Sequence, residues 1–397
     1  GTGSWNGSSN AIKHTQSPRS IQAGGLAGGG MDDRFDFQFS NDDVQDDDGF
    51  ALIAGTYRAF GNDGAHFNDA INTGNNTYYP GDVPRSNALA DDLHDASDHV
   101  PVVVDYQVPA VMFAFANPPN LGDAIVGATL GTTLFVQNTA SVPFAIGADE
   151  LNFDAVGAGD VVGSTSDVAD PLGGFVVAPF FIDTATAGAK TGTIDVDSTS
   201  EATQNGSLQL PIVANVLDHA NPSFDDTLDL DTIEVSIVVP PDSGVHPIDV
   251  PVYNLGFDAQ QALLDLDSID SVPLPFGFSG GLADDIGAAP ATLAFTFDTA
   301  GLPETTISID VDVFWSDEDL PGESAGIVTV TLTATIDAGG EPCDPDLTGD
   351  GSVDVSDLLV LLGMWGPCPG CDADLDGSGV VDVSDLLTLI ANWGPCP

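Results

Sequence analysis

The stretch Thr193-Ile194-Asp195-Val196-Asp197 recurs 115 residues later as Ser308-Ile309-Asp310-Val311-Asp312. Apolar and acidic residues alternate in both copies, which is the pattern of a β-strand with one buried and one solvated face. Two more motifs repeat at nearly the same spacing: Phe181-Ile182-Asp183-Thr184-Ala185 with Thr296-Phe297-Asp298-Thr299-Ala300, and Phe135-Val136-Gln137-Asn138 with Pro251-Val252-Tyr253-Asn254. A tandem domain of this length is typical of an immunoglobulin-like β-sandwich.

Short alternating strands and Gly or Pro punctuation continue from residue 109 to about 338. We predict one β-sandwich over 109–222 and a second over 223–338; both resemble bacterial surface repeats that act as spacers. The region shows no catalytic constellation. Its acidic loops, residues 223–226 and 316–319, are either solvated turns or calcium ligands. The expected fold class is a mainly β multidomain protein, with a partial α/β four-layer sandwich before the repeats and a small α module after them.

That last module contains a 12-residue stretch written twice. Residues 346–357, DLTGDGSVDVSD, recur 28 positions later as residues 374–385, DLDGSGVVDVSD. In each loop, oxygen-bearing side chains occupy positions 1, 3, 5, 9 and 12, and Gly occupies position 6. Position 7 of such a loop contributes its main-chain carbonyl oxygen. Calcium requires several hard oxygen ligands, and the Gly permits the sharp turn that directs them inward. The repeated spacing therefore predicts two calcium sites.

This duplicated loop and helix resembles a type I dockerin, in particular the Gly-Cys-flanked variant used as a surface anchor by planctomycete-like bacteria. We assign it residues 343–397. The resemblance implies two Ca²⁺ ions, with Thr348 and Ser378 replacing the more usual acidic residues. The implied ligands are Asp346, Thr348, Asp350, Asp354 and Asp357 with the carbonyl of Ser352, then Asp374, Asp376, Ser378, Asp382 and Asp385 with the carbonyl of Val380.

Each loop leads into a short predicted helix, over 358–365 and 386–393. Apolar residues at helical spacing predict a core face that includes Trp365 and Trp393. In dockerins, cohesin recognition uses loop positions 10 and 11 and basic residues further along the helix. Here no Lys or Arg follows, and both helices stop at Gly-Pro. The implied partner is therefore a cohesin-like domain or a cell-surface anchor rather than a standard cohesin.

All four cysteines, Cys343, Cys368, Cys371 and Cys396, lie in this module, where disulfides commonly supplement a small core. A zinc site is the competing interpretation, but the spacing follows the calcium repeat and no His is near. Two pairings respect the internal symmetry: Cys343–Cys396 with Cys368–Cys371, which we favour, or Cys343–Cys368 with Cys371–Cys396. Either implies an oxidising compartment, so we expect an extracellular bacterial protein, secreted or attached to the cell surface.

The whole chain is strongly acidic. Its 397 residues include 61 Asp and Glu against 6 Lys and Arg, a formal net charge of −55. Such a charge repels nucleic acid and anionic membranes and favours cations. A hydrophobic content of 42% argues against disorder. No apolar stretch is long enough to predict a membrane span, and the start at Gly1 without a leader suggests a processed product or an incomplete reading frame.

The first 108 residues carry two motifs: Met31-Asp32-Asp33-Arg34-Phe35-Asp36-Phe37, and Ser97-Asp98-His99 opening the apolar strand that follows. In this order and spacing they resemble the C-terminal half of the endonuclease/exonuclease/phosphatase superfamily. The resemblance implies that His99 activates water or stabilises the attacked phosphate, that Asp36 orients His99, and that Asp98 binds Mg²⁺ or Mn²⁺ or its water. The metal-binding Glu and the other groups of the first half are not found, so we expect these residues alone to be inactive.

Together these features favour a secreted, metal-dependent phosphodiesterase or nuclease-like hydrolase, present here as a fragment on β-sandwich spacers with a calcium-dependent anchor. Candidate substrates are extracellular DNA, RNA, nucleotides or lipid headgroups. The alternative is a non-catalytic cell-surface or matrix protein with a structural or adhesive role.

Overall fold

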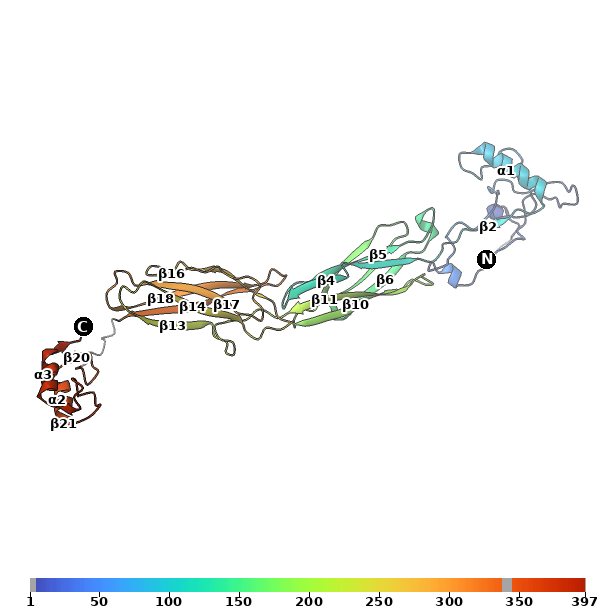
Figure 1. Cartoon of the computed structure of the whole chain (residues 1–397). Helices are drawn as coiled ribbons and strands as arrows, with labels where there is room; N and C mark the ends of the chain where they lie inside the picture. Colours follow the sequence, from blue (N-terminus) through green and yellow to red (C-terminus); the bar gives the residue numbers. More distant parts are fainter. Residues whose placement is uncertain (1–4, 338–344, 397) are drawn as a thin grey trace. The chain divides into compact units, whose positions relative to one another are not determined.

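A computed structural model describes residues 5–337 and 345–396, and it confirms a mainly β fold with several sheets (Figure 1). The chain divides into two compact units, residues 1–218 with 320–322, and residues 219–319 with 323–397. The main junction between these units falls four residues before the predicted boundary at 222/223; the other predicted boundaries stay predictions. Within the described residues, no helix is long and apolar enough to cross a membrane.

The segment before the sandwiches has little regular structure. Its helix α1 (Val83–Ala96) begins where the Asp82 side chain accepts the N–H of Arg85, with Pro84 in the first turn. A small core of Met31, Ala59, Ile71, Ala90 and Val100 lies beside it. The four-layer sandwich stays a prediction, because apart from α1 residues 5–108 contribute only short elements: η1 (Ser8–Lys13), η2 (Asp43–Gln45), and the antiparallel pair β1 (Arg58–Ala59) and β2 (Val102–Val103).

The first sandwich consists of two sheets whose inner faces share one core. One sheet has the order β3 (Met112–Asn117), β5 (Gly131–Asn138), β9 (Val176–Ile182), β7 (Val161–Val162). The other has the order β4 (Asn120–Ile125), β11 (Ser207–Leu217), β10 (Gly188–Ser198), β6 (Leu151–Gly159), β8 (Ser164–Ala169). A single 3₁₀ turn, η3 (Ala145–Gly147), precedes β6.

The second sandwich repeats this strand order except that its described residues contain no strand equivalent to β8. Its sheets run β12 (Pro222–Ser223), β14 (Val245–Asn254), β17 (Ala291–Asp298), β16 (Phe276–Phe278), and β13 (Thr232–Val239), β19 (Ala325–Ile336), β18 (Thr305–Asp317), β15 (Leu264–Ile269). The first strand of the second sheet pairs parallel with its neighbour in both copies, and the other pairs in both copies are antiparallel. The two sandwiches are therefore structural repeats, as the spacing of 115 residues predicts.

The repeated strand motif lies as predicted. Ile194 and Val196 are fully buried in β10, whereas the neighbouring Asp195 is only partly buried and bonds outward to Thr193 and Gln209. In the second copy, Asp310 likewise accepts a hydrogen bond from the exposed face of β19, at Thr331. Alternation thus places the carboxylates in water and the aliphatic groups in the core.

A buried asparagine holds the edge of each core. Asn138 ends β5, where its Oδ1 accepts the N–H groups of Val111 and Ala140, at 3.2 Å each, and its Nδ2 donates to the carbonyl of Asp149 at 2.8 Å. It is 2% exposed. The residue thus satisfies backbone groups that the strand ladder leaves unpaired.

Asn254, its copy at the end of β14, is 5% exposed. It accepts the N–H of Asn221 and donates to the carbonyls of Ala262 and Ile286. The repeated Asn in the sequence is therefore a repeated polar clamp inside the protein.

We expect Asn138→Ala and Asn254→Ala each to lower the free energy of unfolding of their own sandwich by about 2–4 kcal/mol, because buried backbone groups lose their partners. The measurement is guanidinium denaturation of the full chain. The exposed strand residue Thr292 is the control, and Thr292→Ala is expected to stay within about 0.5 kcal/mol. Equal effects of all three changes would contradict this stabilising role of Asn138 and Asn254.

The C-terminal module is built on helices α2 (Val355–Gly363) and α3 (Val383–Ala391). Two short antiparallel ladders join its halves: β20 (Ser352–Val353) with β23 (Gly394–Pro395), and β21 (Gly366–Pro367) with β22 (Val380–Val381). Each loop therefore pairs with the chain that follows the other loop's helix. This exchange closes the module around one small core, formed by Val353, Leu361, Ala373, Val381 and Leu389.

Candidate functional site

The two loops of the C-terminal module bring their carboxylates together. Oxygen atoms of Asp346, Asp350 and Asp357 all lie within 4.8 Å of one another. In the second loop the equivalent group is Asp374, Asp376 and Asp385. Like charges at this separation repel, and a divalent cation relieves the repulsion.

Local hydrogen bonds fix these side chains. In the first loop, Asp346 accepts the N–H groups of Gly349 and Gly351, both at 2.8 Å. Asp357 accepts the N–H groups of Thr348 and Asp354, also at 2.8 Å. The carboxylates are thus oriented by the loop backbone itself.

The last residue of each loop is also part of a helix cap. The side chain of Asp354 accepts the N–H of Ser356, and the side chain of Asp357 accepts the N–H of Asp354. These reciprocal bonds form a capping box. Asp382 and Asp385 repeat this box at α3. The residues at loop positions 9 and 12 therefore stabilise the first turn of the helix and also shape the loop.

The closing aspartates are buried yet favour the ionised form. Burial opposes ionisation of Asp357, but hydrogen bonds from Asp354 and Thr348 outweigh it and lower the pKa of its carboxyl group. For Asp385 the N–H of Asp382 lowers the pKa most, against the effect of burial. Both side chains are 0% exposed. Each loop therefore presents a charged oxygen inside the module, as a calcium site requires.

The other predicted ligands differ in how they are placed. The hydroxyl of Thr348 donates to Asp357 at 2.9 Å, so it lies at the carboxylate cluster. Ser378 donates to the carbonyl of Val380 at 3.1 Å, which brings positions 5 and 7 of the second loop together. Asp354 and Asp382 lie outside the two carboxylate groups and serve as helix caps. Their role as calcium ligands stays a prediction.

One disulfide joins Cys368 to Cys371, with Cα atoms 5.7 Å apart. This is one half of the favoured pairing. Cys396 is also disulfide-bonded and packs against the module core. Its expected partner, Cys343, lies outside the described residues.

The helices expose an apolar face that was predicted to be buried. Trp365 and Trp393 are each 46% exposed, so the prediction that they pack into the core is wrong. Leu361 and Leu389 fill the core instead. Two matching rows remain outside: Val355, Leu359, Leu362 and Trp365 on the first half, and Val383, Leu387, Ile390 and Trp393 on the second, each 46–65% exposed.

A second candidate site lies in the N-terminal segment. Nδ1 of His99 lies 2.7 Å from Oδ2 of Asp36, although 63 residues separate them. Both side chains line a cavity of about 310 Å³ and keep over a third of their surface exposed. When the carboxylate accepts Nδ1–H, the other ring nitrogen of neutral His99 is left free of a proton, and it faces no described hydrogen-bond donor.

Thr15, which sequence reasoning did not assign, holds the pair together. Its hydroxyl accepts the N–H groups of Phe35 and Asp36, and its carbonyl accepts the N–H of Val100. It therefore joins the segment of Asp36 to that of His99. A lone threonine in a loop gives no sequence signal for such a role.

Two other ionisable side chains of this segment, the predicted metal ligand Asp98 and the buried His66, lie away from this pair. Asp98 accepts the N–H of Ala27 at 3.1 Å, which lowers the pKa of its carboxyl group, and it does not line the cavity of His99. His66 uses both ring nitrogens inside the protein, towards Asp63 and the carbonyl of Thr73. Among residues 5–108, no three metal-ligating side chains converge. The Mg²⁺ or Mn²⁺ site and the metal-binding role of Asp98 therefore stay predictions.

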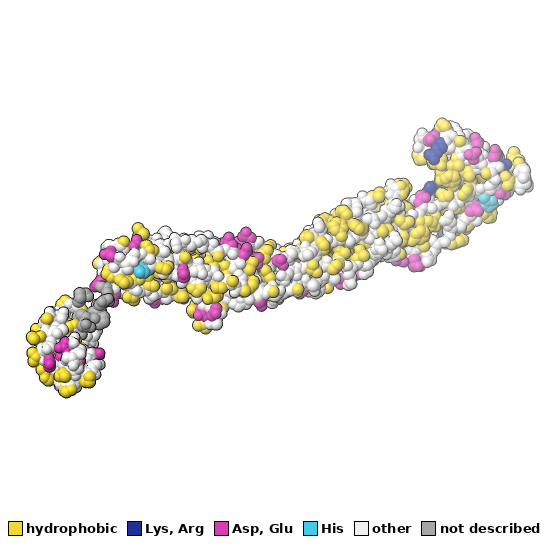
Figure 2. All heavy atoms as spheres, in the orientation of Figure 1, with side chains coloured by type: hydrophobic (Ala, Val, Ile, Leu, Met, Phe, Trp, Pro, Cys, Tyr) yellow, Lys and Arg dark blue, Asp and Glu magenta, His cyan; other side chains and the backbone are white. Residues whose placement is uncertain are grey.

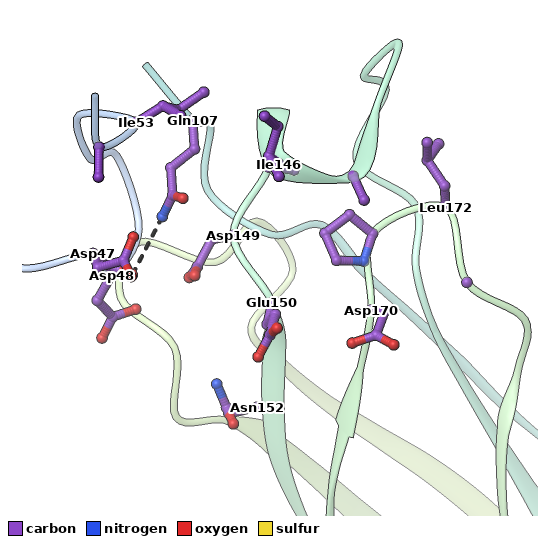
Figure 3. A pocket seen from close by; sticks show the side chains of 15 residues that line it. Asp47, Asp48, Ile53, Gln107, Ile146, Asp149, Glu150, Asn152, Asp170 and Leu172 are labelled. Atoms are coloured by element: carbon purple, nitrogen blue, oxygen red, sulfur yellow. Dashed lines mark hydrogen bonds between the residues drawn. The ribbon is translucent and has the colours of Figure 1, made fainter. Parts of the chain in front are cut away.

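An acidic pocket of about 940 Å³ lies where residues 47–54 meet loops of the first sandwich (Figure 3). Burial raises the pKa of Asp149 to about 6, with the N–H of Gly49 opposing the shift and the nearby Asp48 adding to it. Because the pKa of Asp149 is higher in the folded state than in the unfolded state, its protonated form favours folding. This contribution is fully present below about pH 3.8 and is lost as the pH rises through about 6. Ionised Asp149 therefore disfavours the folded state at neutral pH.

Within the described residues, the acidic loops of the second sandwich do not bring three carboxylates close enough together to hold a metal ion. Asp225 accepts the N–H groups of Thr227 and Leu228 and closes its own turn. Asp317 is fully buried and accepts the N–H groups of Ala220 and Ser324. Both aspartates thus hold loop backbone in place.

No family model matches the chain, and no curated protein matches it. Among solved structures, three N-terminal domains of the outer capsid protein Hoc of bacteriophage RB49 are 11% identical, with a TM-score of 0.28, covering 60% of this chain and 73% of that one. The adhesive subunit CfaE of an enterotoxigenic Escherichia coli fimbria is 10% identical, with a TM-score of 0.22, covering 57% and 87%. A Porphyromonas gingivalis protein of unknown function is 10% identical, with a TM-score of 0.21, covering 56% and 99%. Similarity at this level carries no argument about function.

We expect the chain to bind two Ca²⁺ ions and Asp357→Asn or Asp385→Asn each to remove one, because each change takes a buried charged ligand from one loop. Isothermal titration calorimetry measures the stoichiometry. Chelation should also reduce the helical circular dichroism signal, since binding stabilises folding in such modules. The matched control is Asp372→Asn, at an exposed acid outside both clusters. Two sites remaining in both variants would contradict the assignment.

Proposed function

We propose that the protein is an extracellular bacterial protein held at a partner or surface by its C-terminal module in a calcium-dependent way. The observation that supports this most strongly is the pair of exposed apolar rows on α2 and α3. Each row contains four large apolar residues, and the rows repeat at the 28-residue spacing of the calcium loops. Exposed apolar patches of this kind mark surfaces that become covered by a partner.

The link to calcium follows from the helix caps. Asp357 and Asp385 belong to the carboxylate clusters and also complete the capping boxes in the first turns of α2 and α3. Loss of the ion leaves like charges unopposed at the start of each helix. The exposed row on that helix then loses its support, so binding of the partner depends on the metal.

The proposed partner is a cohesin-like domain or a component of the cell envelope with an apolar groove. The rows carry no Lys or Arg, so recognition rests on apolar contact. The disulfide between Cys368 and Cys371 fits an oxidising, extracellular location.

We expect the full chain to bind cell envelopes of its source bacterium in the presence of Ca²⁺ and to be released by EDTA. The double variant Leu359→Asp/Leu387→Asp should weaken binding by about tenfold or more, because it places a charge in the centre of each row. A co-sedimentation assay measures binding. Val245→Asp is the control, because Val245 is 62% exposed in the second sandwich, outside the module. Binding that survives both EDTA and the double variant would sink the proposal.

A second function, phosphate-ester hydrolysis, is supported by the 2.7 Å contact between His99 and Asp36. Asp36 would hold the ring so that the outer nitrogen of His99 accepts a proton from an attacking water. The substrate would be a phosphodiester or phosphomonoester, including extracellular nucleic acid. Because the described residues of this segment do not gather metal ligands, the role proposed here rests on His99 and Asp36 alone.

We expect any phosphodiesterase activity of the secreted polypeptide to fall about 100-fold or more in His99→Ala. The loss should be smaller in Asp36→Asn, because the amide still offers an oxygen to the His99 ring but lacks the negative charge of the carboxylate. Hydrolysis of bis(p-nitrophenyl) phosphate with added Mg²⁺ measures it. The control is His94→Ala, at a partly exposed residue of α1 paired with Asp95. Activity unchanged in His99→Ala would remove the assignment, and activity absent from the native polypeptide would favour the adhesive alternative.

A further inference from the structure

One sheet of the first sandwich contains no charged residue. The strands β3, β5, β9 and β7 are free of Asp, Glu, Lys and Arg along their whole described lengths, in a chain of net charge −55. The opposite sheet carries aspartates on β4, β6, β8 and β10. The absence of charge is therefore a property of one face rather than of the domain.

The outer side of this sheet is apolar and aromatic. Phe115 and Phe135 are stacked with centroids 4.8 Å apart, and Phe175 contacts both rings at nearly a right angle. Phe113 lies against Phe115 and Phe175. Hydrophobic side chains gather over this sandwich in Figure 2. The cluster extends across three strands, since Phe115 pairs with Phe135 and Phe135 with Val177.

Phe181 extends the aromatic surface along β9. It pairs with Gly131, where an added Cβ would lie 2.8 Å from the Phe181 ring. The ring therefore lies against bare backbone, and Phe181 as a whole is 43% exposed. Glycine at this position leaves room for a flat aromatic surface.

The second sandwich lacks this surface, although its strands are equivalent. The positions of Val177 and Phe181 correspond to Thr292 and Thr296, and that of Phe135 corresponds to Pro251. Asp249 and Asp298 lie on the strands of its equivalent sheet. A spacer domain thus folds without the aromatic residues, so their presence in one copy has a cause other than folding.

The size and charge of the face indicate what covers it. Phe113, Phe175, Val177 and Phe181 are each 43–57% exposed, which amounts to roughly 350 Å² of apolar surface. These four side chains alone supply less than half of the roughly 800 Å² that each partner contributes to a stable protein interface. A second copy would also bring another charge of −55 close to the first.

We propose that this face, the outer side of β3, β5 and β9, binds a neutral polysaccharide. The C–H faces of sugar rings stack on flat aromatic groups without requiring charge. Asn117 and Thr133, paired on the same sheet, and Gln137 beside Phe113 offer uncharged hydrogen-bonding groups to the sugar hydroxyls. A flat sheet face suits an extended chain, and it needs no deep pocket.

The test uses the full chain in affinity electrophoresis against neutral polysaccharides, namely hydroxyethylcellulose, laminarin, amylose and glucomannan, with polygalacturonate as the charged comparison. The variant Phe175→Thr/Val177→Thr/Phe181→Thr gives two positions the residues of the sister repeat, and Thr is well tolerated in strands. The control Val238→Thr/Val245→Thr removes two exposed valines from the second sandwich, 70% and 62% exposed. Thermal unfolding verifies that both variants fold.

The expected result is retardation by at least one neutral polysaccharide, a loss of affinity of about tenfold or more in the triple variant, and no change in the control. Polygalacturonate should not bind, since both partners are anionic. Absence of retardation by every neutral polysaccharide would overturn the proposal, as would equal retardation of the triple variant. Dimerisation of the chain in sedimentation velocity that the triple variant abolishes would also overturn it, because a second copy would then cover the face.

Discussion

The structure depends on where its carboxylates are placed. The chain has 61 acidic residues and only 6 Lys and Arg residues, so most carboxylates have no basic partner within it. Nearly all acidic side chains must therefore stay hydrated or meet a cation. Among the described residues only five are buried: Asp149, Asp317, Asp346, Asp357 and Asp385. Each accepts backbone N–H groups. Three of the five belong to the predicted calcium loops, where a bound cation would supply the charge that the chain lacks.

The two sandwiches show the same constraint in another form. Their cores are apolar, and their strands alternate so that acids such as Asp195 and Asp310 face outward. The buried asparagines Asn138 and Asn254 complete backbone hydrogen bonds at the edges of these cores. Against this background the charge-free sheet of the first copy is exceptional. Its surface differs from that of its sister although the strand order is the same, which separates the residues needed for the fold from those available for binding.

The N-terminal segment and the C-terminal module differ in how their sites are built. Each calcium loop lies within 12 consecutive residues, and its geometry follows from local turns and a capping box. The pair of His99 and Asp36 joins two distant segments, and Thr15 bonds to both of them. A local site repeats in the sequence and is easily recognised, whereas a site assembled from distant segments is only suggested by the order of its motifs.

The sequence by itself determined the repeats, the alternating strands and the grouping of Asp346 with Asp357, because each rests on spacing along one chain. It left two symmetric cysteine pairings open, and the bond between Cys368 and Cys371 was established by the structure. Only the tertiary structure decided which apolar residues face outward. Helical spacing placed Trp365 in a core, but the module is too small to bury every face of α2, and Leu361 fills the space available. The aromatic face over β5 was equally hidden in the sequence, because alternation does not tell which side of a strand meets the second sheet.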